Sequence, residues 1–258
     1  MHELPLVFFT VFTQSAVGAF ILLLIGGAMG LIEPRRMAIG LFSVMCLFGV
    51  GVVLGTIHVG QPLRALNMLF RVGSSPMSNE IVLSACFAAA GGLGSLGLLL
   101  NRGGAMLCKV LVWLAAAIGV VFIFAIPRIY QLATVATWST SYTTMMMVLT
   151  ALIGGGMLAA LFGVRRLGLL VSVLAILASF CLRPGYISTL MSADGVITAA
   201  QSTWFTAQAI LLALGVIGAL LYARMKSGQA VLAMTALVVI AAELVGRIGF
   251  YNLWTIPM

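Results

Sequence analysis

The stretch Leu4–Leu31, LPLVFFTVFTQSAVGAFILLLIGGAMGL, decides the fold class of this chain. A helix needs about 20 apolar residues to cross the hydrocarbon of a bilayer, and this stretch exceeds that length without a charged side chain. It follows Glu3 rather than a basic cluster, and it is far longer than the apolar core of a signal peptide. We therefore expect it to be a retained membrane-spanning helix.

The composition of the whole chain agrees with a membrane protein. Of its 258 residues, 63% are hydrophobic and only 7% are charged, and the mean hydropathy is +1.23. A soluble domain carries about a quarter charged residues, so this composition excludes one. The formal net charge of +8 would suggest nucleic acid as a partner of a soluble protein. Here it is better explained by basic loops that set the membrane topology, and no nucleic acid is expected.

Seven further apolar runs follow the first, and together they predict an all-α integral membrane protein with eight transmembrane helices in a single domain, residues 1–258. The sixth run is the weakest, and we expect it to end at Arg183-Pro184. The segments Pro127–Leu132 and Gly246–Leu253 are alike, which two four-helix halves would explain and which coincidence would explain equally well. The expected spans are residues 4–31, 37–57, 81–100, 110–126, 144–163, 167–182, 205–222 and 230–248.

The distribution of Lys and Arg predicts the orientation, because short basic loops stay in the cytoplasm. The side with more basic residues holds Arg35, Arg36, Arg102, Lys109, Arg165, Arg166, Arg224 and Lys226. The opposite side holds Arg64, Arg71, Arg128 and Arg183. Both termini are therefore expected on the outer, periplasmic side, together with the longer loops.

Polar residues are rare in this chain, and they are densest in His58–Glu80, HVGQPLRALNMLFRVGSSPMSNE, at the outer membrane interface. Pro62 is placed to open a short helix that lies flat on the membrane. Its polar face would carry Arg64, Asn67 and Arg71. The segment Gly73–Pro76 would then turn the chain toward the third span.

At the start of that span, Ser78 is a plausible N-cap, with Glu80 in the first turn. Taken singly, these residues have structural explanations. Glu80 could complement a helix dipole, His58 could bind helix C-terminal carbonyls, and Arg64 could bind lipid phosphate. Taken together, an imidazole, a carboxylate and a guanidinium at the membrane edge suit a quinone headgroup.

Quinol oxidation releases two electrons and two protons, and His58 and Glu80 could accept the protons. Arg64 could stabilise negative charge that develops on the ring. Gln14 and Tyr130 are further candidates to line this pocket, beside Arg71 and Asn67. The electrons would have to leave to an external acceptor.

Glu243 and Arg247 lie inside the last span, four residues apart. We expect an intrahelical ion pair, and the functional alternative is a proton path or a brace beneath the pocket. The four cysteines have no cluster-binding spacing and there are only two histidines. No iron-sulfur cluster, haem or other metal site is therefore expected on this chain.

Five motifs are spread over the whole chain: Glu3–Gln14, His58–Asn67, Ser78–Glu80, Thr137–Trp138 and Glu243–Arg247. In these motifs the chain resembles the DmsC family, the membrane anchor subunits of bacterial dimethyl sulfoxide reductases. The resemblance implies an inner-membrane protein with eight helices that binds menaquinol in anaerobic respiration, with the quinol site at His58, Arg64 and Glu80. It also implies two partners on the outer face, a four-cluster iron-sulfur subunit and a molybdopterin catalytic subunit, which leaves no molybdenum on this chain.

In this interpretation the protein does not catalyse the terminal reduction but supplies the quinol-oxidation site. Two alternatives remain open from the residues themselves. A secondary transporter would place polar residues at the bilayer midplane. A passive anchor would leave the quinol site to a partner subunit.

Overall fold

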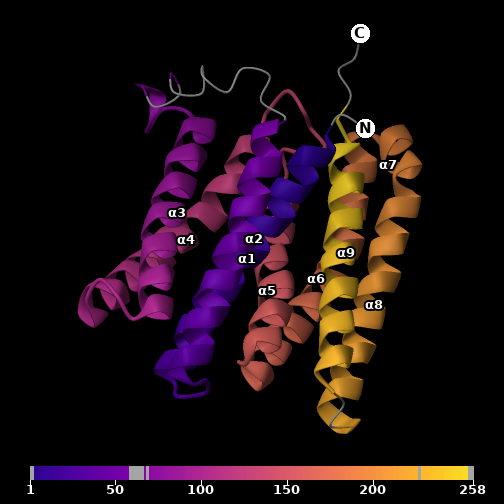
Figure 1. Ribbon diagram of the computed structural model, residues 1–258. Coiled ribbons are helices and arrows are strands. Elements are labelled where there is room, and N and C mark those ends of the chain that lie inside the picture. The colour runs from indigo at the N-terminus through magenta and orange to yellow at the C-terminus, as the bar shows by residue number, and fades with distance from the viewer. Residues whose placement is uncertain (1–2, 58–66, 68–69, 226–227, 255–258) are drawn as a thin grey trace.

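The computed structural model describes residues 3–57, 67, 70–225 and 228–254 of the chain, and these residues form helices joined by turns, with no strand among them (Figure 1). Eight of the helices in these ranges are long and apolar enough to cross a membrane, as predicted. An α-helix satisfies all of its own backbone hydrogen bonds, which lipid cannot do for it. The helices are α1 (Leu4–Ala28), α2 (Pro34–Ile57), α3 (Pro76–Leu100), α4 (Ala105–Tyr130), α5 (Ser141–Phe162), α6 (Arg165–Ala193), α7 (Gly195–Ala200), α8 (Ser202–Met225) and α9 (Gln229–Tyr251).

The eight long helices form two similar groups of four, α1 to α4 and α5, α6, α8 and α9. Within each group the first helix packs against the second and the fourth, and the third packs against the fourth. The groups meet mainly where α1 packs on α5, with α4 on α5 and α1 on α9 as equivalent cross-contacts. In Figure 1, α3 and α4 lie on one side of the molecule and α8 and α9 on the other. This arrangement agrees with the interpretation as two four-helix halves.

Small residues bring α1 and α5 close together. A Cβ atom added to Gly18 would overlap the Ala151 carbonyl oxygen, and one added to Gly155 would lie 2.6 Å from the Ala19 nitrogen. Membrane helices gain most of their mutual attraction from such close packing, because lipid is as apolar as their side chains. The glycines therefore set the distance between the two halves.

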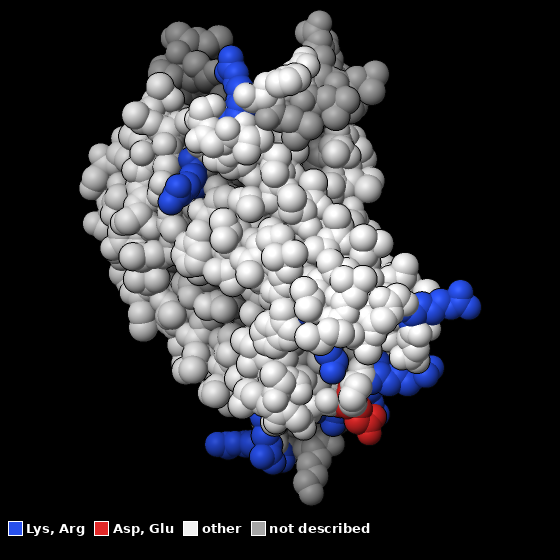
Figure 2. Space-filling view, turned by 90° about the vertical axis from the view of Figure 1, so that its left-hand side faces the viewer, with Lys and Arg blue, Asp and Glu red and all other residues white. Residues whose placement is uncertain are grey.

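Both ends of the described chain lie at one end of the bundle, together with the last residues of α2, the start of α3, and the α4–α5 and α6–α8 connections (Figure 1). The tight turns lie at the opposite end, where Gly30 and Gly163 end helices at positive φ angles of 70° and 132°. Most of the Lys and Arg side chains in Figure 2 gather at this second end, below an uncharged belt. By the positive-inside rule, the end that carries the termini is predicted to face outward.

Two predicted boundaries are wrong at the end of the bundle that carries the termini. The helix α6 does not end at Arg183-Pro184 but continues to Ala193, and α4 continues through Pro127 to Tyr130. Membrane helices tolerate proline where neighbouring groups satisfy the freed carbonyl, so proline is a weak stop signal here. The long loop expected after Arg183 is instead mostly helical, with α7 capped by the Asp194 carboxylate, which accepts from the Ile197 N–H at 3.0 Å.

Candidate functional site

Glu80 is a buried carboxyl near the start of α3. This helix begins at Pro76, after Ser75 in an extended conformation, so Ser78 is not the N-cap that was predicted and Glu80 lies beyond the first turn. The Glu80 side chain is only 7% exposed, and its Oε1 has no hydrogen-bond partner in the part of the chain that the structure describes. A role in complementing the helix dipole does not explain this burial, because an unpaired buried carboxyl is costly.

Two buried tyrosines lie within electrostatic range of Glu80. Tyr130 ends α4 and Tyr251 ends α9, and their hydroxyl groups are hydrogen-bonded at 2.5 Å. Both tyrosines are buried, and both interact electrostatically with Glu80. That Tyr130 lines a quinol pocket with Glu80 stays a prediction, and Tyr251, its hydrogen-bond partner, is a residue that the sequence did not single out.

The α4–α5 connection holds these tyrosines in place. Trp138 is buried and donates its indole N–H to the Phe250 carbonyl oxygen at 2.9 Å, while its ring stacks on that of Phe250. The Thr137 hydroxyl donates to the Leu253 carbonyl oxygen at 3.0 Å. The ring of Tyr130 packs edge to face on Trp138 and Phe250. The result is an aromatic support, formed by Tyr130, Trp138 and Phe250, that ties the end of α4 and the α4–α5 connection to the end of α9.

The other predicted site residues are placed differently. His58 and Arg64 lie outside the described residues. Asn67 and Arg71 are exposed on the α2–α3 connection. Gln14 is fully buried, but it bonds to Arg247 in a second polar cluster.

This second cluster surrounds Arg247, which is 6% exposed. Its Nη2 donates to the Gln14 Oε1 and to the Thr150 Oγ1, each at 3.0 Å. The expected ion pair with Glu243 does not form, although both residues are among those that the structure describes; an ion pair at 4.0 Å instead joins the exposed Glu33 and Arg36. Arg247 reaches across to α1 and α5 instead, and the Glu243 carboxyl faces Thr150 and Gln208.

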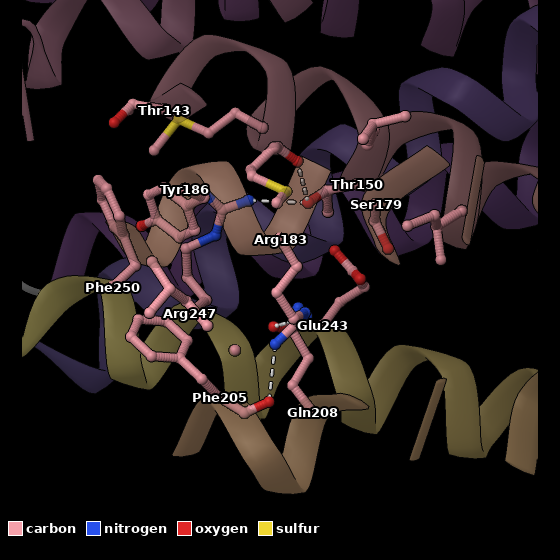
Figure 3. A pocket seen from close by; sticks show the side chains of 16 residues that line it. Thr143, Thr150, Ser179, Arg183, Tyr186, Phe205, Gln208, Glu243, Arg247 and Phe250 are labelled. Atoms are coloured by element: carbon pink, nitrogen blue, oxygen red, sulfur yellow. Dashed lines mark hydrogen bonds between the residues drawn. The ribbon is translucent and has the colours of Figure 1, made fainter. Parts of the chain in front are cut away.

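A cavity of about 50 Å³ lies next to this cluster, between α5, α6, α8 and α9. In Figure 3 the polar ends of Arg183, Gln208, Glu243 and Arg247 converge on it. Arg183 donates to the Phe205 carbonyl oxygen at 2.7 Å and to the Gln208 Oε1 at 2.9 Å. Sequence reasoning placed Arg183 at a loop and overlooked Gln208, although both are polar residues flanked by apolar ones.

Gly246 makes room for Gln208 in this cavity wall. A Cβ atom at this position would overlap the amide group of Gln208. The glycine therefore allows the α8 amide to lie against α9, within reach of Arg183. In the sequence, the glycine directly before Arg247 was a signal for such a close approach.

The chain matches the family model described as DMSO reductase anchor subunit (DmsC) over residues 1–253. It is 41% identical over 161 residues to the anaerobic dimethyl sulfoxide reductase chain YnfH of Escherichia coli (strain K12), covering 62% of this chain and 57% of the relative. It is 35% identical over 205 residues to the C subunit of the anaerobic dimethyl sulfoxide reductase of the same organism, covering 75% of this chain and 70% of the relative.

The C subunit of the anaerobic dimethyl sulfoxide reductase from Haemophilus influenzae is 36% identical over 160 residues, which cover 60% of this chain and 56% of the relative. The matched segments thus span between about half and 70% of the lengths of these relatives. No solved structure matches the chain significantly.

Proposed function

Because the chain belongs to the DMSO reductase anchor subunit family, we propose that it anchors a respiratory reductase complex and oxidises menaquinol at the outer edge of the bacterial inner membrane. The proposed partners are an iron-sulfur subunit that receives the electrons and a molybdopterin subunit that uses them. Both would dock on the end of the bundle that carries the termini. The multi-pass membrane location of this chain follows from its eight apolar helices.

Glu80 supports this function more than any other described residue. Its Oε1 is buried with no hydrogen-bond partner among the described residues, and its charge acts on the buried Tyr130 and Tyr251 hydroxyls. A buried polar atom is nearly always hydrogen-bonded, so an unpaired carboxylate oxygen suits a ligand that brings a hydroxyl donor into an apolar site. A quinol headgroup has such hydroxyls, and the Tyr130 hydroxyl could bond to one of its oxygens.

In the proposed reaction menaquinol loses two electrons and two protons. The electrons pass to the partner's iron-sulfur subunit, and the protons pass to side chains of this protein. Glu80 accepts one proton from a quinol hydroxyl, and the His58 imidazole is the proposed second acceptor. Arg64 would stabilise the negative charge that develops on the ring as the first proton leaves. Tyr130, held by Tyr251 and by the aromatic support, keeps the headgroup oriented toward Glu80.

The test is the oxidation of a water-soluble menaquinol analogue by the purified complex that carries Glu80→Gln or His58→Ala. Each variant should lower the rate at least about 100-fold, because a positioned acid or base contributes that much or more. Glu33→Gln is the matched control, since Glu33 is exposed at the opposite end of the bundle. An unchanged rate in the Glu80 and His58 variants would reject the quinol site.

Two further results would identify the alternatives. A passive anchor would lose only subunit assembly in these variants, with the assembled fraction oxidising quinol normally. A transporter would move solute across liposomes that contain this chain alone.

Arg64→Lys should also lower the rate of quinol oxidation, because a lysine ammonium cannot replace the planar guanidinium in a two-point contact.

A further inference from the structure

Helix α9 carries a polar stripe that leads away from Glu80. Glu243, Arg247 and Tyr251 follow at intervals of four residues, which places their side chains on one face of the helix. Tyr251 touches the candidate quinol site through Tyr130, and Glu243 lies two turns deeper, about 12 Å along the helix axis. The stripe therefore runs from Tyr251, the hydrogen-bond partner of Tyr130, to the cavity between α5, α6, α8 and α9.

The cavity wall contains polar atoms that the protein leaves without partners. In the described part of the chain, the Glu243 Oε1 and the Arg183 Nε are buried and have no hydrogen-bond partner. Glu243 is only 4% exposed and lines the cavity with Arg183, Ser179 and Gln208. A volume of about 50 Å³ has room for about three water molecules, each needing 10–15 Å³ and two to four polar partners. Water is thus the ligand that this wall suits.

The cavity also has a neighbour that leads outward. A groove of about 410 Å³ runs between α6, α7 and α8, and it shares Arg183, Ile187 and Phe205 with the cavity wall. The groove reaches Thr198 of α7 and Ser202 at the start of α8, at the end of the bundle that carries the termini (Figure 1). Arg183, Ile187 and Phe205 thus lie between the cavity and the groove that reaches this end.

We propose that this cavity is hydrated and that Glu243 is a proton-exchange group for protons released at the quinol site. A proton passes from the region of Tyr130 and Tyr251 to water near Glu243 and binds a carboxylate oxygen of Glu243. It then leaves to the cavity water beside Arg183. Glu243 is unchanged after each passage. The inference rests on the proposed quinol oxidation, which is the source of the protons.

Arg247 has a positioning role in this path. A guanidinium stays charged, so it does not carry the proton itself. It holds the Gln14 and Thr150 side chains, and its charge offsets that of Glu243 in a low-dielectric region. A purely structural brace between α1, α5 and α9 would need these same bonds but no water, and this difference makes the proposal testable.

Hydration can be measured in the wild-type complex by radiolytic footprinting, in which hydroxyl radicals form from water and oxidise adjacent side chains. Met147 lines the cavity and is 1% exposed, whereas Met157 on the same helix is 0% exposed and does not line it. Met147 should be oxidised at least about tenfold faster than its matched control Met157. Equal, slow oxidation of both would mean a dry cavity and would overturn the proposal.

The role of Glu243 is tested in the assembled complex with Glu243→Gln and Glu243→Asp. Glu243→Gln should slow quinol oxidation and proton release to the medium about tenfold, and a small weak acid such as formate should restore both by carrying protons into the cavity. Glu243→Asp should retain most of the rate. A Glu243→Gln complex with the wild-type rate, or one that formate does not rescue, would reject proton exchange at Glu243.

A failure of this inference differs from a failure of the proposed function. If Glu80→Gln abolishes quinol oxidation but Glu243→Gln does not affect it, the quinol site stands and Glu243 is not on the proton path. If Glu80→Gln leaves oxidation unchanged, the quinol site itself is rejected and the inference falls with it. Binding of a fluorescent quinone-analogue inhibitor should be unaffected by Glu243→Gln in either case, because Glu243 lies away from the headgroup.

Discussion

The hydroxyl groups of Tyr130 and Tyr251 lie 2.5 Å apart, and their hydrogen bond joins the ends of α4 and α9. These helices are the fourth members of the two four-helix halves. The bond therefore closes the contact between the halves at the place where Glu80 is buried. It makes the shape of the candidate quinol site depend on both halves of the protein.

Removing either hydroxyl should destabilise the fold. Tyr130→Phe and Tyr251→Phe should each lower the free energy of unfolding by about 1–3 kcal/mol, because each leaves the remaining buried hydroxyl without this partner. The double variant should cost less than the sum, with a coupling energy of about 0.5–3 kcal/mol. Unfolding in detergent by SDS titration measures all three. Strict additivity would show that the two hydroxyls do not stabilise each other.

Close packing between α1 and α5 gives a second prediction. Gly18→Val should destabilise the protein by several kcal/mol, since even the first added carbon would overlap the Ala151 carbonyl oxygen, a backbone atom that cannot move aside. Gly49→Ala is the control, because Gly49 has no atom within 4 Å of an added Cβ. The control should be neutral or slightly stabilising. Equal unfolding curves for both variants would contradict the packing of the two halves.

The number of spans could be predicted from the sequence because about 20 consecutive apolar residues are a strong signal in themselves. The ends of spans were harder, as Pro127 and Pro184 show. In water a proline usually marks a helix end, but these two lie inside helices that continue toward the end of the bundle with the termini. The sequence alone does not reveal which neighbouring groups compensate for the missing N–H.

The candidate site was predictable only in part. Glu80 and Tyr130 could be grouped because both fall at the same membrane edge. Gln14 was assigned to this group as well, yet it bonds to Arg247, because its partner depends on how α1 and α9 pack. The Glu243–Arg247 spacing predicted an ion pair within one helix, but partners on other helices compete for the guanidinium, and they cannot be read from the spacing.

The contacts of Arg247 lead to a third prediction. Arg247→Met should destabilise the protein by about 3–5 kcal/mol, because it leaves Gln14 and Thr150 without their buried donor and Glu243 with Arg183 as its remaining neighbouring cation. Arg128→Met is the matched control, since Arg128 is exposed on α4, and it should change stability by less than about 0.5 kcal/mol. SDS-driven unfolding of both variants measures these two changes in stability. A small effect at Arg247 would mean that the second polar cluster contributes little to holding α1, α5 and α9 together.

The orientation of the bundle gives the last prediction. Ser74 lies in the α2–α3 connection and Arg102 in the α3–α4 turn, and both are exposed at opposite ends of the same helix. The excess of Lys and Arg on the Arg102 side predicts that this side stays in the cytoplasm. In a cysteine-free background, a membrane-impermeant thiol reagent should label Ser74→Cys in spheroplasts but Arg102→Cys only after the membrane is opened. The reverse pattern would place Glu80 near the cytoplasmic surface, and the docking face proposed for the iron-sulfur partner would then be on the wrong side of the membrane.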